Sequence, residues 1–64
     1  MVITITPTTL YFEELSDKNF EVLKNVYQIN IKVDNKNRYV VEDTPDKLFK
    51  ILLKLSYDYD IELI

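Results

Sequence analysis

Three carboxylates alternate near the end of the chain, at Asp58, Asp60 and Glu62. If this stretch is an extended strand, the three side chains lie on one face about 6.6 Å apart. Carboxylates hold hard cations such as Mg²⁺, so an Asp-x-Asp pair at a strand end could form part of a nuclease-type site. However, this spacing is too wide for close chelation, and no His or Gly-rich loop accompanies the carboxylates. A solvated strand face is therefore the favoured interpretation, and we expect no metal ion and no cofactor.

Four further carboxylates could join this face if neighbouring strands bring them to the same side of a sheet. They are Glu13, Glu14, Glu42 and Asp43. A row of carboxylates on a small rigid scaffold can imitate the spacing of nucleic-acid phosphates and bind a basic cleft on another protein. The alternative is an ordinary acidic solvent face, which is the default for a chain with a net charge of −3.

Basic and aromatic side chains support an opposite hypothesis. Lys47, Lys50 and Lys54 recur at helical spacing and could contact phosphates, while tyrosines on an open sheet face could stack on bases. Arg38 and Tyr39 could add to such a contact. Lysines on an exposed helix face usually serve only solubility, and the net charge should repel both nucleic acid and anionic membranes. Nucleic-acid binding is therefore the second hypothesis, and no association with a membrane is expected.

The composition removes most familiar catalytic groups. The chain has no Cys, no His and no Gly, which excludes thiol nucleophiles, imidazole bases and glycine-rich phosphate loops. We therefore expect a protein without enzyme activity. No apolar run exceeds three residues and the N-terminus lacks the pattern of a signal peptide, so the expected location is the cytoplasm. The absence of Ala and the abundance of Ile, Lys, Asn, Asp and Tyr are typical of an AT-rich coding sequence.

The strongest helix signal runs from Thr44 to Leu55. Thr44 can cap the first amides, Pro45 suits the first helical position, and Asp46 complements the positive end of the helix dipole. At about 100° per residue, the apolar side chains cover an arc of about 200°, which is wider than one sheet face needs. A second helix or another molecule should cover the remainder. The arc consists of Leu48, Phe49, Ile51, Leu52, Leu53 and Leu55.

The N-terminal segment alternates in the manner of a strand. Val2–Thr6 is rich in β-branched residues, and the extended pattern resumes from Thr8 to Phe12 after an interruption at Pro7. We favour one strand that is broken or distorted at Pro7. A pair of strands is the open alternative.

Three further segments complete the chain. Ser16 can cap a helix that runs to about Tyr27. Residues 29–33 and 38–42 alternate on either side of a polar turn, which predicts a hairpin. Apolar or aromatic residues alternate with carboxylates throughout residues 57–63, which predicts a last strand.

These elements follow the order β-α-β-β-α-β and predict a single α+β domain over residues 1–64. The expected architecture is a two-layer sandwich with both helices on one face of an antiparallel sheet, as in the ferredoxin-like arrangement with strand order 4-1-3-2. Nine apolar residues are expected to form its core: Leu23, Val26, Ile31, Val41, Leu48, Ile51, Leu52, Leu55 and Ile61.

So small a domain buries only about 60% of the surface of its unfolded chain, which predicts a residual apolar patch. We expect this patch at Phe49 and Leu53, with Tyr57 and Tyr59 at its border, as the interface of a homodimer or of another partner. The resulting hypothesis is a small acidic protein-interaction module that occupies a basic, nucleic-acid-binding surface of a host protein. Its size and codon bias suggest an accessory or inhibitory protein of a mobile genetic element such as a phage or virus. A small nucleic-acid-binding domain is the alternative.

Overall fold

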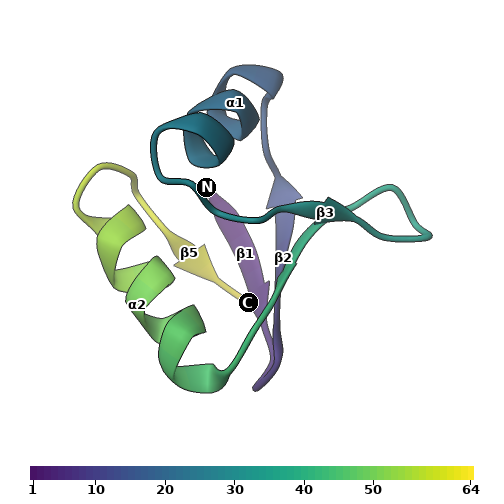
Figure 1. Ribbon diagram of the computed structural model, residues 1–64, viewed down its shortest axis with the longest axis vertical. Helices are drawn as coiled ribbons and strands as arrows, with labels where there is room; N and C mark the ends of the chain where they lie inside the picture. Colours follow the sequence, from purple (N-terminus) through teal and green to yellow (C-terminus); the bar gives the residue numbers. More distant parts are fainter.

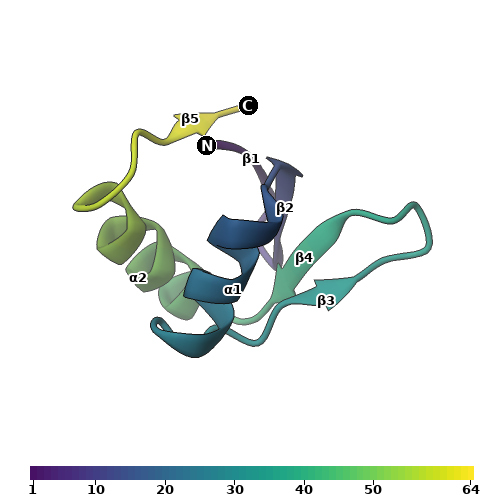
Figure 2. The same ribbon diagram turned by 90° about the horizontal axis from the view of Figure 1, so that it is seen from above.

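The computed structural model describes all 64 residues and contains five strands and two helices. The elements are β1 (Val2–Ile5), β2 (Thr9–Glu14), α1 (Asp17–Asn25), β3 (Lys32–Val33), β4 (Tyr39–Glu42), α2 (Pro45–Ser56) and β5 (Glu62–Leu63). All strands belong to one sheet in the order β3-β4-β2-β1-β5 (Figure 1). Figure 2 shows this curved sheet from above, with both helices on the same side of it. The expected α+β class with two helices is thus confirmed.

The N-terminal segment forms a hairpin and not one broken strand. β1 and β2 pair antiparallel, and the chain reverses at Pro7, whose fixed φ suits the second position of a turn. The Thr6 hydroxyl accepts a hydrogen bond from the amide of Thr9 at 2.9 Å, and the Thr6 amide donates to the Thr9 carbonyl at 2.9 Å. These hydrogen bonds stabilise the turn, which contains no glycine. The preference for a single strand was therefore wrong, and the alternative of two strands is confirmed.

This additional strand changes the sheet order. β1 lies between β2 and β5, and the other four strands keep the relative order that the sequence predicts. Because β1 runs parallel to β5 and antiparallel to β2, the sheet is mixed and not purely antiparallel. The strand order therefore differs from the expected 4-1-3-2 order of a ferredoxin-like sheet.

The last strand is much shorter than the alternation of residues 57–63 predicts. Only Glu62–Leu63 pairs with β1, because α2 continues to Ser56 and the next residues close its end. The amides of Asp58 and Tyr59 both donate to the carbonyl of Leu55, at 3.1 and 2.9 Å. In the absence of a glycine that could end the helix abruptly, the chain uses these residues to turn back toward β1. The prediction of a strand from Tyr57 was wrong for this reason.

Both helix starts are confirmed. The hydroxyl of Ser16 accepts a hydrogen bond from the amide of Asn19 at 3.2 Å, and that of Thr44 accepts one from Lys47 at 3.4 Å. Such caps satisfy amides that have no partner within the helix. Neither helix has the length and apolar character that crossing a membrane requires.

The core lies between the helices and the sheet. Its buried cluster comprises Ile3, Leu10, Phe12, Leu23, Ile29, Val41, Leu48 and Leu55. Of the nine predicted core residues, Leu23, Val41, Leu48 and Leu55 belong to this cluster, and Ile31, Ile51, Leu52 and Ile61 are partly buried against it. Val26 is 72% exposed, because α1 ends before it, so its placement in the core was wrong.

Gln28 follows α1 in the left-handed region, with φ of 56°. Glycine usually occupies this conformation after a helix, since a Cβ atom there costs about 1–2 kcal/mol. We therefore expect Gln28→Gly to raise the free energy of unfolding by up to about 1 kcal/mol, after the added entropy of the unfolded chain is counted. Urea denaturation measures the change.

Two variants serve as controls for this prediction. Gln28→Ala keeps the Cβ atom and should bring no gain. Asn37, with φ of 59°, belongs to a residue type that tolerates this region well, so Asn37→Gly should gain less. Equal stability of Gln28→Gly and Gln28→Ala would contradict the explanation.

Candidate protein-interaction surface

A groove runs along α2, between this helix and the strands β1 and β5. It consists of two hollows of about 340 and 320 Å³. The hollow beside the start of α2 is lined by Ile5, Thr6, Pro7, Pro45, Leu48 and Phe49. The other is lined by Ile5, Phe49, Leu52, Leu53, Ser56, Ile61 and Leu63. Ile5 and Phe49 line both hollows, and no charged side chain lines either; we call these residues together the apolar groove.

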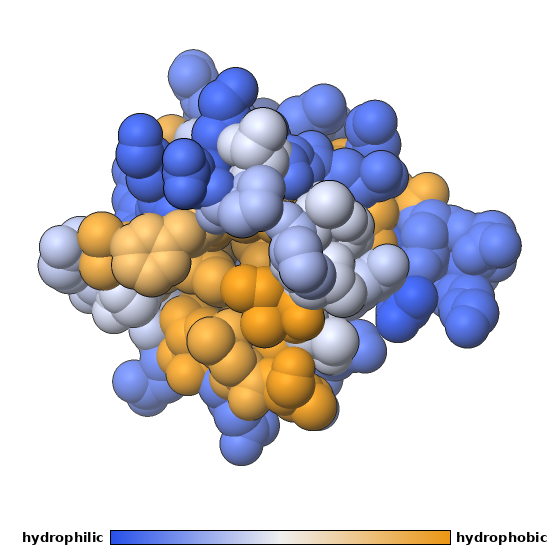
Figure 3. All heavy atoms as spheres, turned by 90° about the horizontal axis from the view of Figure 1, so that it is seen from below, coloured by the Kyte–Doolittle hydropathy of each residue, from blue (hydrophilic) through white to orange (hydrophobic).

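The apolar groove collects much of the exposed apolar surface of the molecule. Phe49 is 65% exposed, Leu63 53%, Leu53 47% and Ile5 41%. Figure 3 looks at the end of the molecule where α2 begins and shows apolar residues gathered into one orange region. Of the eight large hydrophobic residues that are exposed, these four line the groove. Half of the exposed large hydrophobic residues are thus gathered at one site.

The groove stays open because α1 covers a different part of the sheet. The ring of Phe20 in α1 stacks on Tyr39 of β4, with ring centroids 4.6 Å apart. α1 is only nine residues long. α1 therefore contacts β4, whereas the groove lies between α2 and the strands β1 and β5.

The structure places the predicted apolar residues in different surroundings. Phe49 and Leu53 lie in the groove, and Tyr57 follows at the same helical spacing with 78% of its surface exposed. Tyr59 turns inward to Tyr27, with ring centroids 6.4 Å apart. Ile5 was not predicted as a surface residue, because its exposure depends on how far β5 extends along β1.

The structure separates five of the seven predicted acidic residues into two groups. Glu14 and Glu62 both lie beside Val2, and Glu13 precedes Glu14 at the same end of β2. Glu42 pairs with Thr9 at the opposite end, where Asp43 follows. Because Thr9 and Glu13 are four residues apart on one strand, the two groups are separated by roughly 14 Å. The seven carboxylates do not form one row.

Several of these carboxylates have partners within the molecule. Asp58 accepts a hydrogen bond from the hydroxyl of Tyr27. A carboxylate oxygen of Glu13 lies 3.9 Å from a guanidinium nitrogen of Arg38, and one of Asp43 lies 4.0 Å from the Lys47 ammonium. Asp60 is exposed. No group of three or more acidic side chains is arranged to hold a metal ion.

The residues proposed for nucleic-acid contact do not share a face. Tyr39 points toward the helices, where it stacks on α1. The guanidinium carbon of Arg38 lies 4.3 Å from the ring centroid of Tyr11, and Tyr11 alternates with the buried Leu10 and Phe12, so this pair lies on the opposite face of the sheet. The lysines are on α2. The sheet therefore presents no row of free tyrosines.

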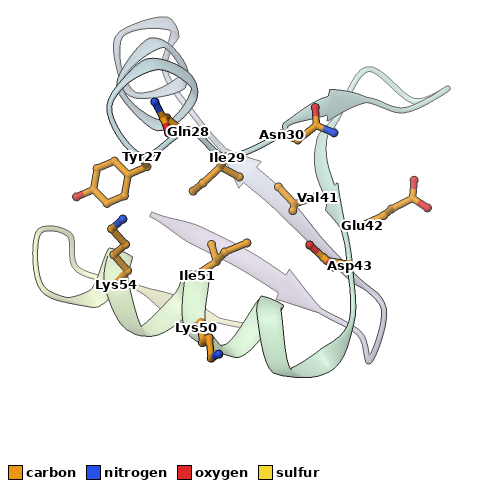
Figure 4. A pocket seen from close by; sticks show the side chains of 10 residues that line it. All are labelled: Tyr27, Gln28, Ile29, Asn30, Val41, Glu42, Asp43, Lys50, Ile51 and Lys54. Atoms are coloured by element: carbon orange, nitrogen blue, oxygen red, sulfur yellow. The ribbon is translucent and has the colours of Figure 1, made fainter.

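A third hollow of about 350 Å³ lies between the end of α1 and α2. Figure 4 shows Tyr27 and Lys54 next to each other at one end of it, and the Lys54 ammonium is 5.6 Å from the centroid of the Tyr27 ring. The lining carries both signs of charge, with Lys50 and Lys54 on α2, Glu42 at the end of β4 and Asp43 directly after it. This mixture favours neither an anion nor a cation.

The hydrogen bond to the Asp58 carboxylate raises the pKa of Tyr27 to about 12. A pKa raised on folding means that the bond stabilises the protein below the ordinary tyrosine pKa near 10, and that this contribution is lost as the pH rises toward 12. In an ultraviolet titration, we expect a late ionisation step at a pH of about 12 that belongs to Tyr27.

The assignment of this late titration can be checked with two variants. Asp58→Asn should lower the pKa of Tyr27 toward 10, and Tyr27→Phe should remove the late step altogether. A wild-type titration without a late step would show that the Tyr27 hydroxyl does not donate a hydrogen bond to Asp58.

No protein-family model, no curated protein and no solved structure matches this chain. The choice between functions therefore depends on surface geometry and charge. Of the three hollows, only the two that form the apolar groove are free of charged side chains.

Proposed function

We propose that this chain is a small, non-catalytic protein-interaction module that binds its partner through the apolar groove. The observation that carries this proposal is that four exposed hydrophobic side chains line one groove without a charged residue. Contiguous apolar surface of this kind on a small protein is typical of interaction sites. An aromatic side chain at the centre, here Phe49, is a common energetic anchor of such interfaces.

The acidic residues have a second role in this proposal. A net charge of −3 attracts a basic partner and accelerates its association, while burial of the groove supplies affinity. Mimicry of nucleic acid by a single carboxylate row has less support, because the carboxylates fall into two separated groups. An inhibitory role for a phage or virus in the cytoplasm stays a prediction.

Capture of partners from a lysate, read by mass spectrometry, tests the groove. The variant Phe49→Ser with Leu53→Ser should lose the proteins that the wild type captures. Val26→Ser with Val33→Ser is the matched control, since these valines are 72% and 59% exposed but lie outside the groove. Circular dichroism should show that both variants remain folded.

Two outcomes would contradict the proposal. One is that the groove variant captures the same proteins as the wild type. The other is that the captured material is nucleic acid and is lost on changing Lys47, Lys50 and Lys54 to Glu, which would favour the alternative function.

A further inference from the structure

We propose that the occupant of the apolar groove is an extended segment of another protein, in which apolar residues alternate with Lys or Arg and which adds to the free edge of β5 as a sixth strand. This inference rests on the proposed function and specifies its mode of recognition. Strand addition beside a helix-lined groove is a recurring way to bind peptides, in which main-chain bonds give affinity and pockets select alternate side chains.

The first observation is the open edge of β5. This strand ends the sheet and pairs only with β1. The amides of Glu62 and Ile64 donate to the carbonyls of Met1 and Ile3, at 2.9 and 3.0 Å. Because backbone groups alternate in direction along a strand, the amide and carbonyl of Leu63 between them point away from β1. These two groups can accept a further strand.

The second observation is the position of the groove relative to this edge. Leu63 pairs with Ile3, which is fully buried beneath the helices, so the side chain of Leu63 faces α2. Leu63 and Ile61 form one wall of the groove, and Leu53 and Phe49 of α2 form the other. Side chains that an added strand directs to this face would enter an uncharged, apolar hollow. Apolar residues fit there.

The third observation is the charge on the opposite face. Glu62 precedes Leu63 and therefore points to the face of the sheet that no helix covers. It is exposed, as is Asp60 two residues earlier. The side chains of an added strand that alternate with its apolar residues would lie beside Glu62. Lys or Arg at these positions is the complementary choice, because opposite charges stabilise cross-strand pairs.

The same charge argues against a second copy as the occupant. If two β5 strands paired antiparallel about a two-fold axis in full alignment, Glu62 would lie opposite its own counterpart. Like charges in this position destabilise a sheet, and each copy also carries a net charge of −3. The other free edge, β3, carries Lys32 and has no groove residue beside it.

Synthetic peptides provide the probe. We would titrate the isotope-labelled protein with a peptide of alternating Leu and Lys, a peptide of the same composition with its Leu and Lys in separate blocks, and an alternating Leu and Glu peptide. The alternating Leu and Lys peptide should bind about tenfold or more tightly than either of the others. Hydrogen exchange of the Leu63 amide should slow in that complex.

Variants separate the two parts of the recognition. Glu62→Lys should reverse the preference in favour of the Leu and Glu peptide, and Leu53→Ser should weaken binding of both alternating peptides. Lys32→Glu on the opposite edge is the control and should change neither affinity. The alternating Leu and Lys peptide should not bind when the backbone nitrogens that would pair with β5 are methylated.

Several results would overturn the inference. Equal affinity for the peptide that has its Leu and Lys in separate blocks would exclude strand addition. Binding without slower hydrogen exchange of the Leu63 amide would also exclude it. Protection of Leu63 in the free protein, with sedimentation as a dimer, would identify a second copy as the occupant. If no peptide binds while partner capture still depends on Phe49 and Leu53, the inference fails and the proposed function stands; if capture is independent of the groove, the proposed function fails.

Discussion

Replacing Thr4 with proline is expected to leave the chain largely unfolded. The carbonyl of Ile3 accepts a bond from the β5 side, so the amide of Thr4 in the same peptide unit faces β2, where Tyr11 is its register partner. Proline removes this donor in the middle of a sheet and leaves the facing carbonyl without a partner. A domain of this size has only about 3–10 kcal/mol of stability in total. Circular dichroism and thermal denaturation would measure the loss.

The same substitution on an edge strand is the matched control. The amide of Asp34 donates to Arg38, so the preceding amide, that of Val33, points away from β4 into solvent. Val33→Pro should therefore be much less destabilising than Thr4→Pro. Thr4→Ala controls for loss of the side chain. A stable Thr4→Pro variant would mean that β1 is not a central strand of the sheet.

Leu55→Ala is expected to reduce the free energy of unfolding by about 2–5 kcal/mol, because it removes a fully buried side chain from the core and leaves a cavity. Leu53→Ala is the matched control on the same helix. Leu53 is 47% exposed, and its truncation should cost much less. Urea denaturation of both variants measures the difference. Similar losses for the two variants would show that α2 is rotated relative to this structure.

Features that depend on neighbouring residues could be predicted from the sequence. Ser16 and Thr44 cap the helices as predicted, because a cap needs only a hydroxyl and an amide three residues later. The predicted hairpin also forms between β3 and β4, although its first strand is limited to Lys32–Val33 and does not begin at residue 29. Its turn is held by the Asp34 carboxylate, which accepts bonds from the amides of Lys36 and Arg38 at 2.9 and 2.8 Å, and these bonds, that to Arg38 first, lower the pKa of Asp34.

Features that depend on distant residues could not be predicted. Pro7 is compatible with both a distorted strand and a turn, and only the pairing of Thr4 with Tyr11 decides between them. The alternation from Tyr57 onward is typical of a strand, but the chain needs these residues to return from α2 to β1.

The apolar groove could also be predicted only in part from the sequence. Phe49 and Leu53 stood out because they widen the apolar arc of one helix, which is a local property. The contributions of Ile5 and Leu63 could not be foreseen, since they arise where β5 stops short of the end of β1. The separation of the acidic residues could not be predicted for a similar reason. The distances between them depend on which strands are neighbours in the sheet and not on their order in the chain.

The pairing of β1 with β5 also has a kinetic consequence. It joins Val2 to Glu62 and Ile3 to Leu63, residues that are separated by nearly the whole chain, and contacts of this kind form late because a long loop must close first. Only two residues of β5 take part, so this strand should detach more easily than the rest of the sheet. One wall of the apolar groove would then open and close in the native protein, and a bound segment would hold it shut.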